Sequence, residues 1–148
     1  MRTPTTWFVV ADGAHARILA RKGRTQRLTN VFPYEFAAPH APNRRFVTDR
    51  PGAFADRGPG AHAYAPRIAA RDLEKLAFIR DVAAVVDEAA EAQAFDRLIL
   101  IAPPATLGGL RTMLNEKTKA RIAAEIKKDL THLSLPALER HLAEIAVA

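Results

Sequence analysis

The stretch Thr6-Trp-Phe-Val-Val-Ala-Asp12-Gly13-Ala-His-Ala-Arg-Ile-Leu-Ala20 carries the strongest fold signal in this chain. Two apolar runs flank the pair Asp12-Gly13. This dipeptide between extended segments is typical of a β-hairpin, because a type I′ turn needs positive φ at both central residues. We therefore expect Asp12 and Gly13 to form a structural turn that joins a strand at residues 7–11 to a second strand at residues 15–21.

The two strands of this hairpin differ in pattern. The first run shows no alternation, as expected for a central strand that is covered on both faces. In the second run, apolar and polar residues alternate, which predicts a position nearer the edge of the sheet. Ala16, Ile18 and Ala20 share one face of it, and the other face has His15, Arg17 and Arg21.

Length and composition are those of an ordinary globular protein. The chain has 148 residues, of which 49% are hydrophobic and 26% charged, and this length favours one domain over residues 1–148. Because there is no cysteine, disulfides, thiol catalysis and Cys-ligated zinc are excluded. No apolar run approaches the roughly 18 residues of a membrane span, and the polar residues 1–6 are not typical of a signal peptide. We expect a cytoplasmic protein without membrane contact.

The net charge of +6 is unevenly distributed along the chain. Residues 1–70 have eleven Arg and Lys against four Asp and Glu (+7), whereas residues 71–148 have eleven against twelve (−1). A basic half of this kind indicates an anionic partner, most commonly nucleic acid. Ten of its eleven cations are arginine, which suits contacts with phosphates and bases. A general solubility charge is the alternative explanation.

Periodicity and turn residues predict the next elements. A third strand at residues 26–34 completes an antiparallel meander. A long helix follows, from residues 66–70 to residue 94, and its buried stripe consists of Leu76, Ile79, Val82, Ala83, Val86 and Ala90. The run Arg97-Leu-Ile-Leu-Ile-Ala102 then predicts a buried strand parallel to the first, because long helices usually connect parallel strands.

The last third of the chain predicts three helices and one strand. We expect a helix at residues 107–114 with Thr106 as its N-cap, and a short helix at residues 116–121 capped by Asn115. Residues 122–130 favour an edge strand, although continuation of the helix is the alternative. Ser134 caps a final helix that ends near residue 145, with Pro136 in its first turn.

The element order β-β-β-α-β-α-β-α outlines a ribonuclease H-like α/β fold. In this fold an antiparallel meander is followed by α-β-α-β-α, and the mixed sheet has five strands. We expect the strand order 3-2-1-4-5.

Residues 37–66 form a long basic loop that is rich in proline and glycine. Arginines interleaved with rings are what RNA needs for phosphate pairing and base stacking. An insertion whose rings pack back onto the core is the alternative. The predicted nucleic-acid-binding residues are Arg44, Arg45, Arg50, Arg57, His62 and Arg67.

A second candidate site is the start of the helix at residues 107–114. Its free N–H groups would lie at the carboxyl end of a central strand, where α/β sheets tend to bind ligands. Thr106, Leu107 and Gly108 are therefore an anion or ligand candidate. The pair Gly108-Gly109 favours close packing over approach of a ligand, because glycine is costly in a helix.

No complete catalytic constellation is present. A two-metal nuclease needs clustered carboxylates, and Asp12, Asp96 and Asp129 lie next to predicted strands. The turn already explains Asp12, however, and Asp96 lies at the wrong end of its strand to meet Asp12. The only serine is Ser134, without a nucleophile motif, and the five histidines lack ligand spacing and are expected on the surface. We expect no cofactor, no metal and no catalytic residue, so the chain leans away from being an enzyme.

Three blocks of sequence resemble a known family. They are residues 6–19, the segment Ile101-Ala-Pro-Pro-Ala-Thr-Leu-Gly-Gly-Leu-Arg111, and Glu125-Ile-Lys-Lys-Asp-Leu-Thr-His-Leu133. Together they look like the bacterial host attachment proteins, which in turn resemble the central domain of archaeal and eukaryotic class I peptide release factors. The resemblance implies the same sheet order and a translation-linked or ribosome-associated role. The family name implies an effect on attachment to hosts or surfaces.

One departure from the release-factor pattern bears on activity. That domain acts through a Gly-Gly-Gln tip, whereas the corresponding loop here has Gly58-Pro-Gly60-Ala-His62, and the only glutamines are Gln26 and Gln93. Hydrolysis of peptidyl-tRNA would require His62 to replace the glutamine. We expect a non-enzymatic RNA- or ribosome-binding domain. The alternative is a protein-interaction module in attachment or stress physiology, and pairing of edge strands into a homo-oligomer stays open.

Overall fold

The computed structural model describes residues 3–24, 27–33, 35–39 and 64–145. The strands are β1 (Thr5–Ala11), β2 (His15–Lys22), β3 (Thr29–Asn30), β4 (Phe36–Ala37), β5 (Arg97–Ile101) and β6 (Ile122–Ile126). The helices are α1 (Tyr64–Glu91), α2 (Pro104–Met113), α3 (Glu116–Lys119) and α4 (Leu135–Ile145).

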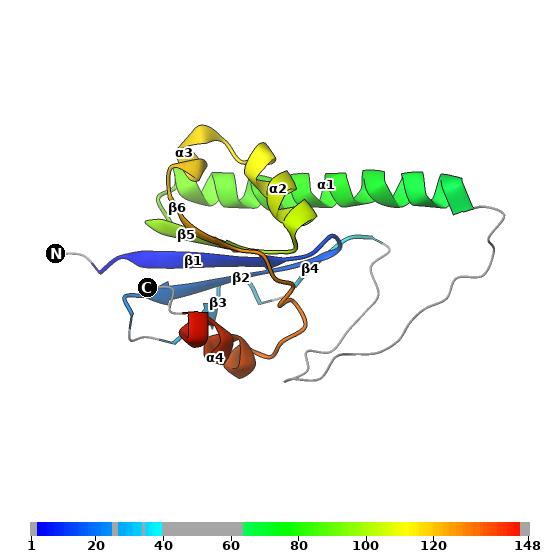
Figure 1. The fold of residues 1–148 in the computed structure, drawn as a ribbon. Coiled ribbons are helices and arrows are strands. Elements are labelled where there is room, and N and C mark those ends of the chain that lie inside the picture. The colour runs from blue at the N-terminus through cyan, green and yellow to red at the C-terminus, as the bar shows by residue number, and fades with distance from the viewer. Residues whose placement is uncertain (1–2, 25–26, 34, 40–63, 146–148) are drawn as a thin grey trace.

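These elements form three layers, in which α1, α2 and α3 cover one face of the sheet and α4 covers the other (Figure 1). The strand order is β3-β2-β1-β5-β6, and β4 also pairs with β2. β1 and β2 are antiparallel, whereas β5 is parallel to both β1 and β6. The predicted mixed α/β fold and its strand order are confirmed.

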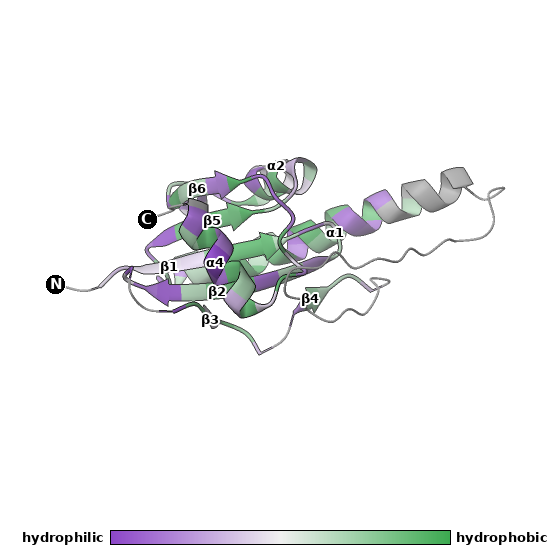
Figure 2. Ribbon diagram, turned by 60° about the horizontal axis from the view of Figure 1, so that its bottom comes forward, coloured by the Kyte–Doolittle hydropathy of each residue, from purple (hydrophilic) through white to green (hydrophobic). Residues whose placement is uncertain are grey.

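β1 lies at the centre of two apolar cores. Trp7 and Val9 pack under α1 and α2, and Phe8 and Val10 pack against α4. The absence of alternation in this run therefore reflects cover on both faces, as predicted. Coloured by hydropathy, the middles of the central strands are green, and polar residues gather at their ends (Figure 2).

β2 lies nearer the edge of the sheet than β1, as predicted, but its polar face is buried. His15 is 3% exposed and Arg17 is 5% exposed, so the prediction of a surface position is wrong for His15. Nη1 of Arg17 donates to the carbonyl of Leu133 at 2.5 Å. The cover comes from the segment just before α4, more than a hundred residues away, and no local pattern in β2 reports it.

The hairpin turn is present, but its geometry differs from the prediction. The N–H of Asp12 donates to the carbonyl of His15 at 2.9 Å, so Gly13 and Ala14 are the central residues. Neither Asp12 nor Gly13 has positive φ, and the predicted type I′ turn is wrong. Oδ1 of Asp12 instead accepts the N–H groups of Ala14 at 2.8 Å and His15 at 2.7 Å, an Asx turn.

Two elements differ in extent from their predictions. The expected third strand shortens to β3, because Pro33 follows and lacks an N–H for the ladder. β4 then makes a separate pairing with β2. α1 buries the predicted stripe except Leu76, which is 46% exposed, because the first part of α1 extends beyond the sheet (Figure 1).

α1 ends earlier than predicted, at a left-handed residue. Gln93 has φ 60°, its N–H donates to the carbonyl of Ala90 at 3.0 Å, and the N–H of Ala94 donates to Ala89 at 2.9 Å. This pair of hydrogen bonds is a Schellman motif, which terminates the helix.

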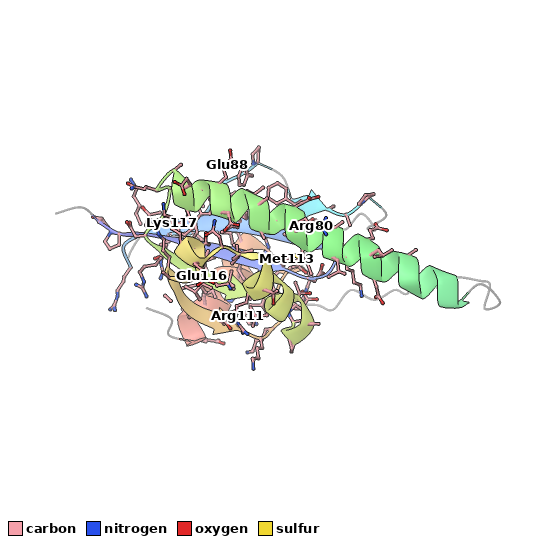
Figure 3. The ribbon with its side chains drawn as sticks, turned by 90° about the horizontal axis from the view of Figure 1, so that it is seen from above. Arg80, Glu88, Arg111, Met113, Glu116 and Lys117 are labelled. Carbon is pink, nitrogen blue, oxygen red and sulfur yellow. The ribbon has the colours of Figure 1, made fainter. Side chains whose placement is uncertain are left out.

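α2 begins three residues earlier than predicted. Its N-cap is Pro103, with Pro104 in the first turn, a position where proline loses nothing because that N–H has no helical partner. The prediction of Thr106 as N-cap is therefore wrong. Gly109 packs closely on α1, because a Cβ built there would lie 3.3 Å from Cδ1 of Ile79, and Figure 3 shows the two helices side by side.

The last elements follow the predictions closely. Oδ1 of Asn115 accepts the N–H of Thr118 at 2.9 Å and caps α3, although α3 ends at Lys119. β6 confirms the edge strand, but its register shifts next to Leu98, so Ile122 joins the α1 side and Ile126 the α4 side. Oγ of Ser134 accepts the N–H of Ala137 at 3.3 Å.

Candidate nucleic-acid interface

Most of the predicted nucleic-acid contacts lie outside the described residues. Arg44, Arg45, Arg50, Arg57 and His62 belong to residues 40–63, which the structure does not describe. Arg67 belongs to the first turns of α1, and the description there covers its backbone alone. The predicted loop site therefore stays a prediction.

At the start of α2, the candidate ligand site, the helix and its packing already use most of the groups that a ligand would contact. The N–H of Leu107 donates to the carbonyl of Pro103 at 2.8 Å, and the side chains of Leu107 and Thr106 are 1% and 7% exposed. Gly108 faces open space, with no atom within 4 Å of a Cβ built there. Packing of Leu107 explains its position, and the ligand role of this turn stays a prediction.

Two carboxylates meet one hydroxyl where β1 and β6 end. Oγ1 of Thr131, a residue with no exposed surface, lies 3.2 Å from Oδ2 of Asp12 and 2.7 Å from Oδ1 of Asp129. The same Oδ1 of Asp129 accepts the N–H of Thr131 at 3.1 Å. We call Asp12, Thr131 and Asp129 the carboxyl-end network. Sequence reasoning weighed both aspartates as metal ligands but did not foresee Thr131 between them.

Asp96, the third carboxylate weighed for metal binding, lies at the opposite end of the sheet. Its Oδ2 accepts the N–H of Thr5 at 2.8 Å. Within the part of the chain that the structure describes, no group of three or more His, Cys, Asp or Glu side chains is placed to hold a metal ion.

Arginines gather where β1 and β5 begin. In the sheet, Thr6 lies opposite Arg21 of β2 on one side and Arg97 of β5 on the other, so these side chains share the face that α4 covers. Arg24 lies in the turn that follows β2, and Arg27 lies beside Arg21 at the wall of a hollow. We call Arg21, Arg24, Arg27 and Arg97 the arginine cluster.

The electrostatics of the cluster act on Arg21. Its guanidinium lies over the ring of Phe8, 5.2 Å from the centroid. Burial lowers the pKa of Arg21, and the nearby charges of Arg97 and Arg24 lower it further. Like charges therefore crowd this end of the sheet.

A hollow of about 200 Å³ lies beside the cluster. Glu139 lines it and uses Oε2 to accept the N–H of Leu28 at 2.9 Å. The lining residues are Arg21, Arg27, Leu28, Glu139, Leu142 and Ala143.

The arginine cluster was not found from the sequence, although a signal for it exists. Arg97 is far from Arg21 in sequence, and only the parallel pairing of β1 with β5 brings them level with Thr6. The predicted hairpin and crossover contain this signal. When the paired strands are aligned residue by residue, both arginines lie beside the start of β1.

Comparison with known proteins places the chain in a family. The family described as "protein required for attachment to host cells" matches residues 7–142. The chain belongs to this family. The resemblance seen in the three sequence blocks is thus confirmed across nearly the whole sheet and α4. No curated protein matches the chain.

The family member also has the fold of a translation factor domain. The crystal structure of an archaeal translation termination factor is similar to it, with 16% sequence identity and a TM-score of 0.53. The similarity covers 96% of this chain and 38% of that chain. The chain thus corresponds in fold to a part of the termination factor.

Within the described residues, no helix has the length and apolar character to span a membrane.

Proposed function

We propose that this chain is a non-enzymatic, RNA- or ribosome-associated domain with a translation-linked role. The observation that carries the proposal is the fold likeness to a translation termination factor over nearly the whole chain. The charge of residues 1–70, eleven cations against four anions, supports it, because a basic surface on such a fold suits a phosphate backbone. An effect on attachment to host cells then follows indirectly, through translation.

Sedimentation with ribosomes tests this function. The tagged chain is centrifuged with ribosomes from its own lysate, at low and at high salt, with and without ribonuclease. We expect co-sedimentation that falls with salt, because the contacts are ionic. The variant in which Arg44, Arg45, Arg50 and Arg57 become alanine should lose it. A matched control replaces four exposed cations outside the loop by alanine, namely Arg80, Lys117, Lys127 and Lys128.

The outcomes of the sedimentation experiment separate the parts of the proposal. Absence of the wild-type chain from every ribosomal fraction, together with no affinity for RNA, would refute the function. Retained binding in the loop variant would keep the function and move the contact elsewhere on the domain.

A second function, a protein-interaction module, is favoured by one observation. Leu73 is 69% exposed and Leu76 is 46% exposed, and both belong to the N-terminal half of α1. Neighbouring exposed leucines are typical of a surface that a protein covers. This reading predicts a complex that ribonuclease does not release and that Leu73→Gln with Leu76→Gln abolishes.

A further inference from the structure

The outer edge of β2 has a break between two short partner strands. β3 pairs with residues 19–20 of β2, and β4 pairs with residues 15–16. Arg17 and Ile18 therefore lie at the break, where the N–H of Val31 donates to the carbonyl of Ile18 at 2.9 Å before the chain leaves the ladder. Local disruptions of an edge ladder, such as β-bulges, are often found next to functional sites.

A pocket of about 210 Å³ opens at this break. Its walls come from three parts of the chain, namely β2, the segment between β3 and β4, and the start of α4. Two charged side chains line it, Arg17 and Glu35, together with the apolar side chains of Ile18, Phe32 and Leu135. Distant segments thus bring a few polar groups and several apolar ones to one concave space, as in sites for small ligands.

Arg17 and Glu35 give the pocket one positive and one negative group. Arg17 is 5% exposed, and its Nη1 donates to the carbonyl of Leu133 at 2.5 Å, which holds the guanidinium in place. Burial lowers the pKa of Arg17 and the charge of Glu35 raises it, so the two groups lie close to each other. A guanidinium has several N–H donors and a carboxylate several acceptor positions, so both keep capacity for a ligand.

The paired charges select the kind of ligand. Walls with one cation and one anion have no net charge, so they favour a neutral molecule with donor and acceptor atoms side by side over a phosphate or a cation. The ring of Phe32 and the aliphatic side chains of Ile18 and Leu135 suit the flat faces of an aromatic base. A nucleobase combines both properties.

Guanine fits the charged wall better than the other bases. Its O6 accepts from a guanidinium, while its adjacent N1–H and exocyclic amine both donate to a carboxylate. Adenine has an acceptor, the ring nitrogen N1, next to its amine, and a carboxylate would meet that lone pair. The volume of about 210 Å³ leaves room for one base, which only an unpaired position of an RNA can insert.

We propose that the pocket at the break between β3 and β4 binds a guanine base, with O6 on Arg17, its two donors on Glu35 and its ring against Phe32. The inference rests on the proposed RNA association and names the base that the domain reads. A guanine of an unpaired RNA residue and that of a free nucleotide offer the same edge to these walls.

Anisotropy of two labelled single strands measures this recognition with the full chain. Both strands have about twelve nucleotides, which matches the site size of one small domain. One strand contains a single central guanosine among uridines, and the other has adenosine at that position. Free guanosine monophosphate is the competitor, and adenosine monophosphate is its control. The wild-type chain should bind the guanosine strand about tenfold more tightly, and the guanosine nucleotide should displace it.

Two variants test the walls of the pocket. Glu35→Gln keeps the size of the side chain but can donate as well as accept, so the guanosine strand should lose about tenfold in affinity and the preference over adenosine should disappear. Phe32→Leu keeps an apolar wall without a ring, so both strands should lose about fivefold. Glu116→Gln on α3, where Glu116 is 92% exposed, is the matched control. Urea unfolding shows whether each variant is folded.

The outcomes separate this inference from the proposed function. Equal affinity of the wild-type chain for both strands would overturn the guanine pocket and leave RNA association intact, and this comparison needs no variant. A guanosine preference that Glu35→Gln retains as fully as Glu116→Gln would also overturn it. No affinity for either strand would remove the proposed RNA association. Binding of guanosine monophosphate that Glu35→Gln abolishes would in that case support the pocket, with a free nucleotide as its ligand.

Discussion

Charged side chains have opposite surroundings at the two ends of the parallel strands. At the carboxyl ends, Asp12 and Asp129 are held by backbone N–H groups and by the hydroxyl of Thr131. At the amino ends, Arg21 and Arg24 have like charges for neighbours. The difference teaches that charge which the fold itself satisfies with hydrogen bonds maintains the structure, whereas like charges that crowd one another act against it.

The same contrast bears on the aspartates that sequence reasoning weighed as metal ligands. Carboxylates at the carboxyl end of a central sheet strand suggest metal chemistry when the sequence is read alone. Their hydrogen bonds give Asp12 and Asp129 a structural task, and Arg111 pairs with Glu125 nearby, with Nε 3.1 Å from Oε2. The four predictions below test whether one end is structural and the other is crowded by like charges.

The largest effect is expected for Asp12→Ala. The substitution removes the acceptor of two backbone N–H groups in the hairpin turn, so we expect the free energy of unfolding to fall by about 2–3 kcal/mol. Asp12→Asn keeps Oδ1 and should lose about 1 kcal/mol or less. Urea unfolding measures both. A wild-type melting temperature that rises with Mg²⁺ would instead assign Asp12 to a metal site.

Thr131→Val tests the centre of the carboxyl-end network. Valine fills nearly the same space, but the buried hydroxyl that lies between Asp12 and Asp129 is lost. We expect a loss of about 1–2 kcal/mol in the free energy of unfolding. Thr131→Ser keeps the hydroxyl and is the control. Equal unfolding midpoints for the valine and serine variants would contradict a role for the hydroxyl.

At the other end of the sheet, Arg24→Gln should stabilise the protein. The exposed charge of Arg24 acts against that of Arg21, so its removal is expected to raise the free energy of unfolding by up to about 0.5 kcal/mol. The gain should shrink in high salt, which screens the repulsion. Lys128→Gln, remote from the cluster, is the control. A destabilised Arg24→Gln variant would mean that the fold uses this arginine.

The smallest effect concerns Arg111 and Glu125, labelled in part in Figure 3. The hydrogen bond from Arg111 lowers the pKa of Glu125. A lowered pKa in the folded state stabilises the protein above the ordinary range of glutamate, and this contribution disappears as the pH falls through the lowered value. Arg111→Gln should raise the pKa of Glu125 toward the ordinary range of a glutamate, as seen by NMR titration of its carboxyl carbon.

A difference in melting temperature between the wild-type chain and Arg111→Gln should therefore exist at neutral pH and vanish in acid. The pair is exposed, with side-chain accessibilities of 50% and 24%, so the difference is small at any pH. A gap that grows as the pH falls would contradict the sign of this linkage.

Much of the fold could be predicted from local pattern. The uninterrupted run before Asp12, the caps Asn115 and Ser134, and the helical stripe around Val82 each depend on residues within a few positions of one another. Strand order followed because long crossovers join parallel strands. The predictions were wrong where segments far apart in the sequence determine burial. Leu76, for example, is exposed because the sheet ends beneath α1.

The candidate site was harder to predict for a physical reason. A segment rich in arginine is visible in composition, and it predicts six binding residues, five in the loop and Arg67 just after it. The arginine cluster depends on register, because Arg21 and Arg97 become neighbours only when two different strands align beside Thr6. Burial of Arg17 likewise depends on the carbonyl of Leu133. The periodicity of β2 does not predict this contact.

By itself, the sequence determined the element order apart from β4, the central position of the first strand, the basic character of residues 1–70 and membership of a family. These properties follow from periodicity, composition and short motifs, which act over a few residues. Only the tertiary structure decided which charges are satisfied and which remain crowded. That distinction depends on the distance between groups far apart in the chain and on the water that their packing removes.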